Sequence, residues 1–542
     1  MPEIPGTPPA RRPTRIVLVG YGTVGARFVE GLVAAVAAGQ VELTVVGAES
    51  HDAYNRVLLA EYAVGRADRA RLDMTDSQAA STAGVSLRLG EAVTFVDRAR
   101  QQLRLDSGDT LGYDRLVFAT GARANIPSLE GLETARRDRR SIAAAPAALD
   151  HGASPLPAGV VALRDLADAN TVLGAVRAGK RIVVLGAGVL GMEIALAATE
   201  HGATVIAVHH GDTPMARQLD TGGGRALSRA AHRAGVTMAA HSRAEGILFR
   251  TGDDGQPHFD ALFCADGKQI AGDLLLLSCG VGARTELAAR ADLAVSTGIL
   301  VDEELRSWSD PDVFAIGDCA HIAARGSELA DGRVPGSPSG LVGPGWRQAD
   351  WLAARLVAES ATVASPRRIT DSLPVEGRPQ VVMLKAEGID VVAGGDVSHD
   401  LWDSSDTLQS TVWADPARGT YTKMTTRDNV LEGFVAVGLP RTGAELTLLF
   451  ERRGELPADR SALLRLDAAD AGALSGTDPN APDATVCWCN GVSVQHIHDA
   501  AATGATTVEQ VGACTRAGTG CGTCKGRIAE VLARSAANSV AG

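Results

Sequence analysis

Aromatic residues are scarce in this chain of 542 residues, at 4% of the total, while alanine, valine and glycine are abundant. Side chains this small suit closely packed layers of helices and parallel strands better than an antiparallel sandwich. No stretch reaches about 18 unbroken apolar residues, which argues against a membrane-spanning helix. The first thirteen residues, MPEIPGTPPARRP, also lack an apolar run. We therefore expect a disordered N-terminus (1–13) that is neither a signal peptide nor an anchor.

An excess of positive charge is also missing, because the formal net charge is −12. A nucleic-acid or anionic-membrane partner would favour a basic face, so we expect neither. Cysteines are sparse except in one cluster of five between Cys487 and Cys524. In a chain of this size such a cluster indicates metal or redox chemistry rather than structural disulfides, and we expect a cytoplasmic protein.

A dinucleotide-binding turn is predicted near the N-terminus. The apolar run Thr14–Gly20 is typical of a buried parallel strand, and GYGTVG follows it before a helical stretch. Gly20 would make the tight turn, Gly22 would let a pyrophosphate approach the backbone, and Gly25 would allow close helix packing. A second strand ends at Glu49, where a carboxylate can bind a ribose hydroxyl. This motif alone does not identify the class of protein, because a glycine-rich turn after a strand also occurs in unrelated α/β proteins.

Two further segments favour FAD as the ligand of this first site. Tyr113–Arg123 and Asp312–Ala320 each run from an apolar strand into a short turn. They resemble segments of the two-dinucleotide flavoprotein oxidoreductases, in which the first lies near the FAD pyrophosphate and the second carries an aspartate that binds ribityl or phosphate oxygens. The resemblance implies these FAD-binding residues: Ala119, Thr120, Gly121, Gly317 and Asp318.

A second unit of the same kind begins at Arg181. The strand RIVVLG leads into GAGVLG, a helical stretch and a further strand, and another glycine turn closes the insert. The natural occupant is NADH or NADPH, with its nicotinamide against the flavin. The strand end carries two histidines instead of an acid, which admits a 2′-phosphate, although both can equally be loop surface. The candidate residues are Gly186, Gly188, Gly191, His209 and Gly280.

The C-terminal cysteines have the spacing of an iron–sulfur module. CWC and CGTC follow a linker-like stretch and offer four thiolates from two loops, which can hold iron or a structural zinc ion. The run TRAGTGCGTC, about thirty residues after CWC, resembles the bacterioferritin-associated ferredoxin-like [2Fe–2S] module. We interpret Cys514 as a packing residue. The resemblance implies four cluster ligands: Cys487, Cys489, Cys521 and Cys524.

Further resemblance extends over nearly the whole chain. YNRVLLAEYAVG, ARQLD and GLVGPGWRQA are similar to segments of the large subunit of assimilatory nitrite reductase and of the electron-transfer subunit of assimilatory nitrate reductase. That resemblance implies that Asn55 and Arg56 line the FAD site. The cysteine spacing of a sirohaem domain is absent from the sequence. We therefore expect the terminal acceptor on another polypeptide, a molybdenum-containing nitrate reductase catalytic subunit.

The predicted fold class is α/β: a two-dinucleotide-binding-domain flavoprotein with nested Rossmann-like FAD and NAD(P) domains, an α+β interface domain and a small helical [2Fe–2S] domain. The stretch near 136–161 is expected to be a solvated surface insertion rather than a docking loop. The predicted boundaries are an FAD-binding domain at 14–165 and 296–365, an NAD(P)-binding domain at 166–295, an interface domain at 366–466, a linker at 467–485 and a cluster domain at 486–535.

The predicted function is an NAD(P)H-dependent, FAD-containing reductase that delivers electrons through the cluster to a separate catalytic subunit. No catalytic side chain is predicted, because hydride transfer to a flavin requires positioning above all. One alternative is the FAD/[2Fe–2S] subunit of an amine or opine oxidase-type dehydrogenase, or a partial nitrite reductase component. A redox sensor or scaffold with vestigial sites is another. The intact glycine motifs argue against both the oxidase-type subunit and the scaffold.

Overall fold

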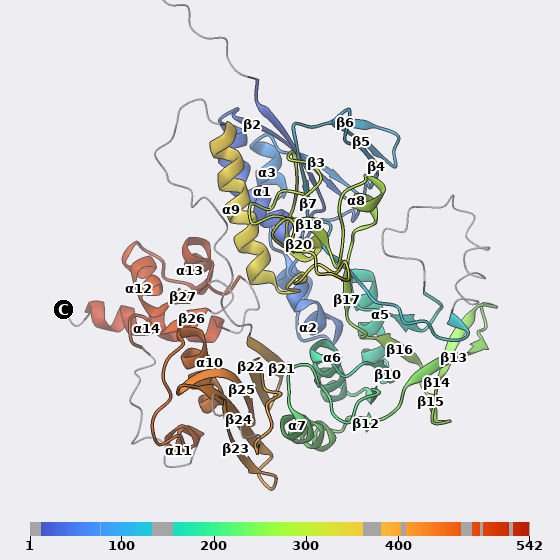
Figure 1. Cartoon of the computed structure of the whole chain (residues 1–542), viewed down its shortest axis with the longest axis vertical. Coiled ribbons are helices and arrows are strands. Elements are labelled where there is room, and N and C mark those ends of the chain that lie inside the picture. The colour runs from blue at the N-terminus through green and yellow to red at the C-terminus, as the bar shows by residue number, and fades with distance from the viewer. Residues whose placement is uncertain are drawn as a thin grey trace, which may run out of the picture.

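Two parallel sheets, one inserted into the other along the chain, are followed by an antiparallel sheet and a small helical module (Figure 1). The computed structural model describes residues 12–75, 77–132, 156–360, 381–402, 408–467, 480–487, 491–519 and 524–540. Within these ranges, none of the helices combines the length and apolar character that a membrane crossing requires. The parallel sheets and the helices between their strands confirm the predicted α/β class.

The first sheet is centred on β1 and has the strand order β19-β7-β1-β2-β3, with all neighbours parallel. Its strands are nearly continuous apolar runs because helices cover both faces. Helix α1 packs so closely on α9 that a Cβ at Gly31 would lie 2.7 Å from the Cβ of Ala353. The elements are β1 Thr14–Val19, α1 Thr23–Ala37, β2 Val41–Gly47, η1 Arg56–Leu58, α2 Leu59–Ala63, η2 Ala70–Leu72, α3 Ser77–Thr82, β3 Ser86–Leu89, β7 Arg115–Phe118, β18 Ile299–Val301, β19 Val313–Ala315, η3 Gly317–Cys319, β20 Ala320–Ile322 and α9 Val342–Ser360. A small antiparallel sheet adds β4 Val93–Asp97, β5 Gln102–Leu105 and β6 Thr110–Gly112.

The second sheet repeats this plan around β10, in the parallel order β12-β11-β10-β16-β9. Most of the predicted insertion near 136–161 lies outside the described residues. Its end is not surface, because Val160 and Val161 are buried and form β9 at the edge of this sheet. The chain therefore enters the second unit before residue 166. The elements are β9 Val160–Val161, α5 Leu166–Arg177, β10 Arg181–Leu185, α6 Val189–Glu200, β11 Thr204–Val208, α7 Thr221–Arg233, β12 Thr237–Ala239, β13 Ala244–Thr251, β14 Pro257–Cys264, β15 Gln269–Ala271 and β16 Leu274–Leu277.

The nesting is made by two crossings of the chain. Strand β8 (Ala122–Ala124) leads out of the first unit and β17 (Val281–Ala283) returns to it, and the two pair antiparallel. Helix α8 (Glu286–Arg290) follows the return. Thr120 Oγ1 donates to the carbonyl of Arg284 at 3.1 Å, which ties the outgoing and returning segments together. The two crossings thus lie side by side at the junction of the units.

A five-stranded antiparallel sheet, in the order β21-β22-β25-β24-β23, follows. It packs on the second unit: a Cβ at Gly222 of α7 would lie 2.4 Å from the ring of Tyr421, and one at Gly223 would lie 2.8 Å from Val435. Tyr421 also donates to Asp220, the N-cap of α7, at 2.5 Å. One hydrophobic core therefore joins this sheet to the second unit. The elements are β21 Val381–Ala386, β22 Ile389–Gly395, β23 Gln409–Asp415, β24 Thr420–Arg427, β25 Val430–Val437, α10 Pro440–Arg452, α11 Ser461–Leu464 and η4 Arg465–Asp467.

The C-terminal module has a core of its own. Its buried apolar side chains, among them Val494, Ile497, Val511 and Ile528, form one cluster that is made only of residues from this module. Ser493 and Thr507 cap α12 and α13 with reciprocal capping boxes, which explains where both short helices begin. The elements are β26 Thr485–Cys487, β27 Val492–Ser493, α12 Val494–Ala502, α13 Val508–Thr515 and α14 Lys525–Val540.

Candidate functional site

The first glycine turn connects β1 to α1 through two positions that only glycine can fill. Gly20 has φ +110°, and a Cβ there would lie 2.3 Å from the carbonyl oxygen of Ala119. A Cβ at Gly25 would lie 2.3 Å from the carbonyl oxygen of Gly20, so the helix can approach the strand this closely only without side chains. Gly22 differs, because the atom nearest to a Cβ added there would be Arg56 Nε, at 3.8 Å. The middle glycine therefore faces open space.

The second glycine turn has the same geometry. Gly186 has φ +110°, and a Cβ there would lie 2.2 Å from the carbonyl oxygen of Ser278. A Cβ at Gly191 would lie 2.0 Å from the carbonyl oxygen of Gly186. Around Gly188 no atom would lie within 4 Å. In both turns, the first and third glycines lie where a side chain would clash, and the middle glycine has free space beside it. This is the division of roles that the sequence predicts.

The helices that follow these turns present unused backbone donors. Helix α1 begins after Gly22 and α6 after Gly188, and neither has a side-chain hydrogen bond at its N-cap. By contrast, Asp165 caps α5 and Asp220 caps α7. Uncapped N-terminal N–H groups and the positive end of the helix dipole suit a phosphate group. The residues at both turns therefore fit the pyrophosphate of a dinucleotide.

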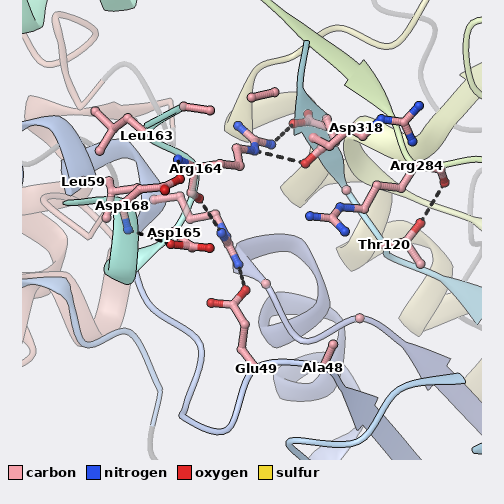
Figure 2. Close-up of a pocket in the computed structure, with 18 of the residues that line it drawn as sticks. Ala48, Glu49, Leu59, Thr120, Leu163, Arg164, Asp165, Asp168, Arg284 and Asp318 are labelled. Atoms are coloured by element: carbon pink, nitrogen blue, oxygen red, sulfur yellow. Dashed lines mark hydrogen bonds and ion pairs between the residues drawn. The ribbon is translucent and has the colours of Figure 1, made fainter. Parts of the chain in front are cut away.

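A cavity of about 1530 Å³ lies between the two units. It exceeds the usual range of about 300–1,000 Å³ for small-ligand sites, so it has room for a dinucleotide. Its wall includes Leu190 and Glu193 of α6, so it extends from the first glycine turn to the start of the second unit. Figure 2 shows the charged side chains that line it. Of the predicted residues it is lined by Gly20, Gly22, Glu49, Arg56, Ala119, Thr120, Gly121, Gly317 and Asp318.

Three of the arginines that line this cavity have shifted pKa values, and Figure 2 labels two of these three, Arg164 and Arg284. Burial opposes the charge of Arg56, but Glu49, Tyr54 and Asp165 together more than offset it, so the pKa of Arg56 is raised. Burial lowers the pKa of Arg164, and Asp318, at 3.3 Å from its Nη2, partly offsets that effect. Burial lowers the pKa of Arg284 as well, with Arg56 and Arg164 adding to the effect. Cations that repel one another in a half-buried cavity suit a ligand with two negative phosphates.

Glu49 is held in place from two sides. Tyr54 Oη donates to one carboxylate oxygen at 3.0 Å, and Arg56 donates to the other. The guanidinium of Arg56 also stacks on the ring of Tyr54, 4.8 Å from its centroid, and donates to the carbonyl of Arg164 at 2.8 Å. The carboxylate therefore has a fixed direction at the carboxyl end of β2, where a ribose hydroxyl would meet it.

The remaining predicted positions lie away from the cavity lining. Asn55 is buried beside it and accepts from the N–H of Val57 at 3.0 Å. Gly280 has φ +84° in the turn between β16 and β17, and its carbonyl accepts from the N–H of Asn125 at 3.0 Å, which ties this turn to the end of β8. His209 is buried at the end of β11, and its Nε2 has no hydrogen-bond partner among the described residues. Burial lowers the pKa of His209, with His210 adding to the effect.

Two of the four proposed cluster ligands are described, and both lie in the core of the cysteine module. Cys487 ends β26 and Cys524 directly precedes α14, and both are buried. Cys489 and Cys521 lie outside the described residues. Cys514, in α13, is exposed, so it is not the packing residue that the sequence suggested. A thiolate just before a helix N-terminus is stabilised by the helix dipole, which suits a cluster ligand.

The scattered cysteines have environments that disfavour thiolate chemistry. Burial raises the pKa of Cys264, Cys279 and Cys319. Cys319 Sγ donates to the carbonyl of Ile316 at 3.2 Å, inside the first core. These thiols behave as small buried groups, which agrees with the interpretation from sequence.

Sequence reasoning missed two of the three arginines. Arg164 directly precedes Asp165, the N-cap of α5, and its Nε donates to the carbonyl of Ala122 in the outgoing crossing. Arg284 directly follows the returning crossing β17 and is the last residue of the glycine turn that closes the insert. That turn was recognised from the sequence, but only the junction of the units shows that its arginine lines the cavity. The run LRD before a helix-forming stretch was the one available signal for Arg164.

The fold and the cavity together define a flavin-dependent reductase with two dinucleotide folds and an iron–sulfur module. The chain belongs to the pyridine nucleotide-disulphide oxidoreductase family, whose model matches residues 14–336. The model of the BFD-like [2Fe-2S] binding domain matches residues 485–534. The protein is accordingly an NAD(P)H-dependent oxidoreductase whose cofactors are FAD and a [2Fe–2S] cluster. The resemblance stated from the sequence is confirmed.

Individual proteins are similar over most of the chain. Nitrite reductase [NAD(P)H] of Bacillus subtilis is 28% identical, over 96% of this chain and 57% of that protein. The assimilatory nitrate reductase electron transfer subunit of the same organism is 27% identical, over 96% of this chain and 59% of that protein. This chain therefore spans only 57% and 59% of these two relatives. The crystal structure of a covalent putidaredoxin reductase–putidaredoxin complex shares the fold, with a TM-score of 0.65, 23% identity and coverage of 83% of this chain and 95% of that one.

Proposed function

We propose that this protein is an electron-transfer subunit that oxidises NAD(P)H and delivers single electrons to a separate catalytic subunit. The observation that carries the proposal is the cavity that joins the first glycine turn to Leu190 and Glu193 at the start of α6. A nicotinamide bound at the second turn and a flavin bound at the first would meet there. Each NAD(P)H then yields NAD(P)⁺, one proton and two electrons.

The first glycine turn would bind FAD in this proposal. Gly20 and Gly25 shape the turn, Gly22 leaves room for the FAD pyrophosphate at the start of α1, and Glu49 fixes its ribose. Arg164 and Asp318 orient the ribityl and phosphate groups from the other side of the cavity. Bound FAD supplies the conversion from two-electron to one-electron chemistry.

The second turn has the matching task for the coenzyme. Gly188 leaves room for the pyrophosphate of NAD(P)H beside the start of α6. His209 and Gly280 border this site at the ends of β11 and β16. The cluster would be held by Cys487, Cys489, Cys521 and Cys524 and pass one electron at a time.

The terminal acceptor that we propose is the catalytic subunit of a molybdenum-containing assimilatory nitrate reductase, in the cytoplasm. Support comes from the relative that is an electron transfer subunit of assimilatory nitrate reductase. Reduced thiols persist in the cytoplasm, which suits a chain whose cysteines serve as cluster ligands.

The test is anaerobic stopped-flow spectroscopy of the purified holoprotein, mixed separately with NADH and NADPH. We expect bleaching of the flavin absorbance, followed by loss of the visible band of the cluster. A Cys524→Ser variant is the matched control: it should keep the flavin phase and lose the cluster phase. If neither coenzyme bleaches the flavin, the proposal is wrong. Once the protein is reduced, addition of a purified nitrate reductase catalytic subunit together with nitrate should restore the oxidised spectrum, because nitrate takes up the electrons.

A further inference from the structure

The turn that follows α13 contacts the first unit beside the dinucleotide cavity. Arg516 Nη2 lies 3.1 Å from the Glu30 carboxylate of α1. The carbonyl of Thr519 accepts from Asn55 Nδ2 at 3.4 Å. Asn55 immediately precedes Arg56, whose side chain lines the cavity. In the sequence, Thr519 is two residues before Cys521, a proposed cluster ligand.

The turn is built to present both groups on the same side. Arg516 has φ +64° and ends α13, and its carbonyl accepts from the N–H and the hydroxyl of Thr519 at 3.3 and 2.8 Å. Gly518, at φ +80°, lies between them against Ile528 of the module's core. This turn holds Arg516 and Thr519 together, and both contact the first unit. Their position therefore follows from the fold of the module itself.

The contact is polar and weak, in contrast to the other junctions of the molecule. The module's hydrophobic cluster includes no residue of the reductase, whereas the antiparallel sheet shares a core with the second unit. A second polar contact, Arg452 Nη2 to Asp483 at 3.2 Å, lies at the base of the module. A half-exposed ion pair contributes little to stability, and salt screens it. A contact of this kind forms and breaks readily while the chain keeps the two parts together.

We propose that Glu30 and Arg516 form an electrostatic latch that holds the cluster module against the reductase while it accepts electrons, and releases it to meet the acceptor. The inference rests on the proposed function. The occupant of this face of α1 is the chain's own cluster module, and Asn55 aligns it with the cavity wall. Glu30 and Arg516 are positioning residues in this scheme, since both act through the placement of the module.

The latch makes a prediction about salt. Raising the concentration of NaCl from about 50 to about 500 mM shortens the Debye length and weakens an ion pair between half-exposed groups. We expect the radius of gyration of the holoprotein, measured by small-angle X-ray scattering, to increase over this range. Amide hydrogen exchange should rise several-fold in peptides that contain Asn55 and Thr519.

Charge reversal tests the pair itself. Glu30→Lys and Arg516→Glu should each give, at low salt, the larger radius and the faster exchange that the natural protein shows at high salt. The double variant should recover the docked values. Glu42→Lys, at an exposed position on β2 of the same unit, controls for a change in charge and should match the natural protein. If the single variants match the natural protein, or the double variant does not recover, the latch is wrong.

These readouts keep the latch and the proposed function apart. Neither scattering nor hydrogen exchange requires electron transfer. If Arg516→Glu unfolds the module, the visible absorbance of the cluster will be lost, and Glu30→Lys still tests the latch alone. If NAD(P)H bleaches the flavin but the latch variants change neither the radius of gyration nor the amide exchange, only the latch is contradicted. If docking responds to charge but NAD(P)H does not bleach the flavin, only the proposed function is contradicted.

Discussion

Gly211 lies after β11 in the place that Glu49 occupies after β2. The N–H of Gly20 donates to the carbonyl of Val46, and the N–H of Gly186 donates to the carbonyl of Val208, both at 2.8 Å. The third residue after Val46 is Glu49, and the third after Val208 is Gly211. The second unit therefore has no carboxylate where the first has one, and His209 corresponds to the last residue of β2.

Placing an acid at this position should shift the coenzyme preference towards NADH. A Cβ at Gly211 would meet only Thr213 O at 3.7 Å and His209 Nδ1 at 4.0 Å, so Gly211→Glu should fold normally. Its carboxylate would bind the ribose hydroxyls of NADH and repel the 2′-phosphate of NADPH. We expect the ratio of kcat/KM for NADH over NADPH to rise about tenfold, which is about 1.4 kcal/mol.

Steady-state reduction of ferricyanide by each coenzyme measures this ratio. Gln269→Glu, at an exposed position on β15 of the same unit, is the control and should leave the ratio unchanged. An unchanged ratio in Gly211→Glu would mean that the coenzyme ribose lies elsewhere.

Alanine substitutions at Gly188 and Gly191 of the second turn should have different effects, the first on coenzyme binding and the second on stability. Gly191→Ala places a Cβ 2.0 Å from a carbonyl oxygen, so we expect the apparent Tm to fall by about 5 °C. Gly188→Ala meets no atom within 4 Å and should leave Tm unchanged, but its methyl group occupies the proposed path of the pyrophosphate. The KM for NAD(P)H should then rise at least about tenfold. Thermal unfolding and coenzyme titration measure the two effects, and an unchanged KM in Gly188→Ala would contradict the proposed path.

His209 should make the protein less stable in mild acid. Burial, with neighbouring histidines adding to it, lowers the pKa of His209 in the folded state. Below the unfolded pKa of about 6.5 the unfolded chain therefore binds a proton that the folded chain does not, and stability is lost as the pH falls. We expect a His209→Asn variant to lose less Tm than the natural protein between pH 7.5 and 5.5. His232→Asn, at an exposed position on α7, is the control and should behave like the natural protein.

Loss of a cluster ligand should leave the reductase intact. Because the module has its own core, Cys524→Ser should abolish the visible absorbance of the cluster and loosen α14 without releasing FAD. The ratio of flavin to protein, measured after gel filtration, should equal that of the natural protein. Release of FAD from this variant would show that the module also supports the flavin site.

The sequence predicted the parts of the site that repeat. Gly20, Gly25, Gly186 and Gly191 could be assigned because their steric tasks leave a fixed spacing after an apolar strand, and the structure has both strands and both helices where that spacing puts them.

What the sequence could not give is the geometry between segments far apart in the chain. Arg164 and Arg284 are separated by 120 residues, yet both line the cavity because β8 and β17 pair. The contact between Arg516 and Glu30 depends on how two independently folded parts meet, and no local pattern encodes it. The end of the predicted insertion was misplaced because two valines are too short a strand to stand out from a variable stretch.

The contact of α7 with Tyr421 and Val435 has a consequence for the synthesis of the chain. Gly222 and Gly223 lie in the second unit, but the side chains that cover them are about two hundred residues further along. At about 5–20 residues per second, the ribosome needs roughly 10–40 seconds to add those residues. During that interval the nascent second unit exposes an apolar face of α7. A chaperone that binds the nascent chain would bind this face of α7, and it would have to dissociate before β24 and β25 could pack there.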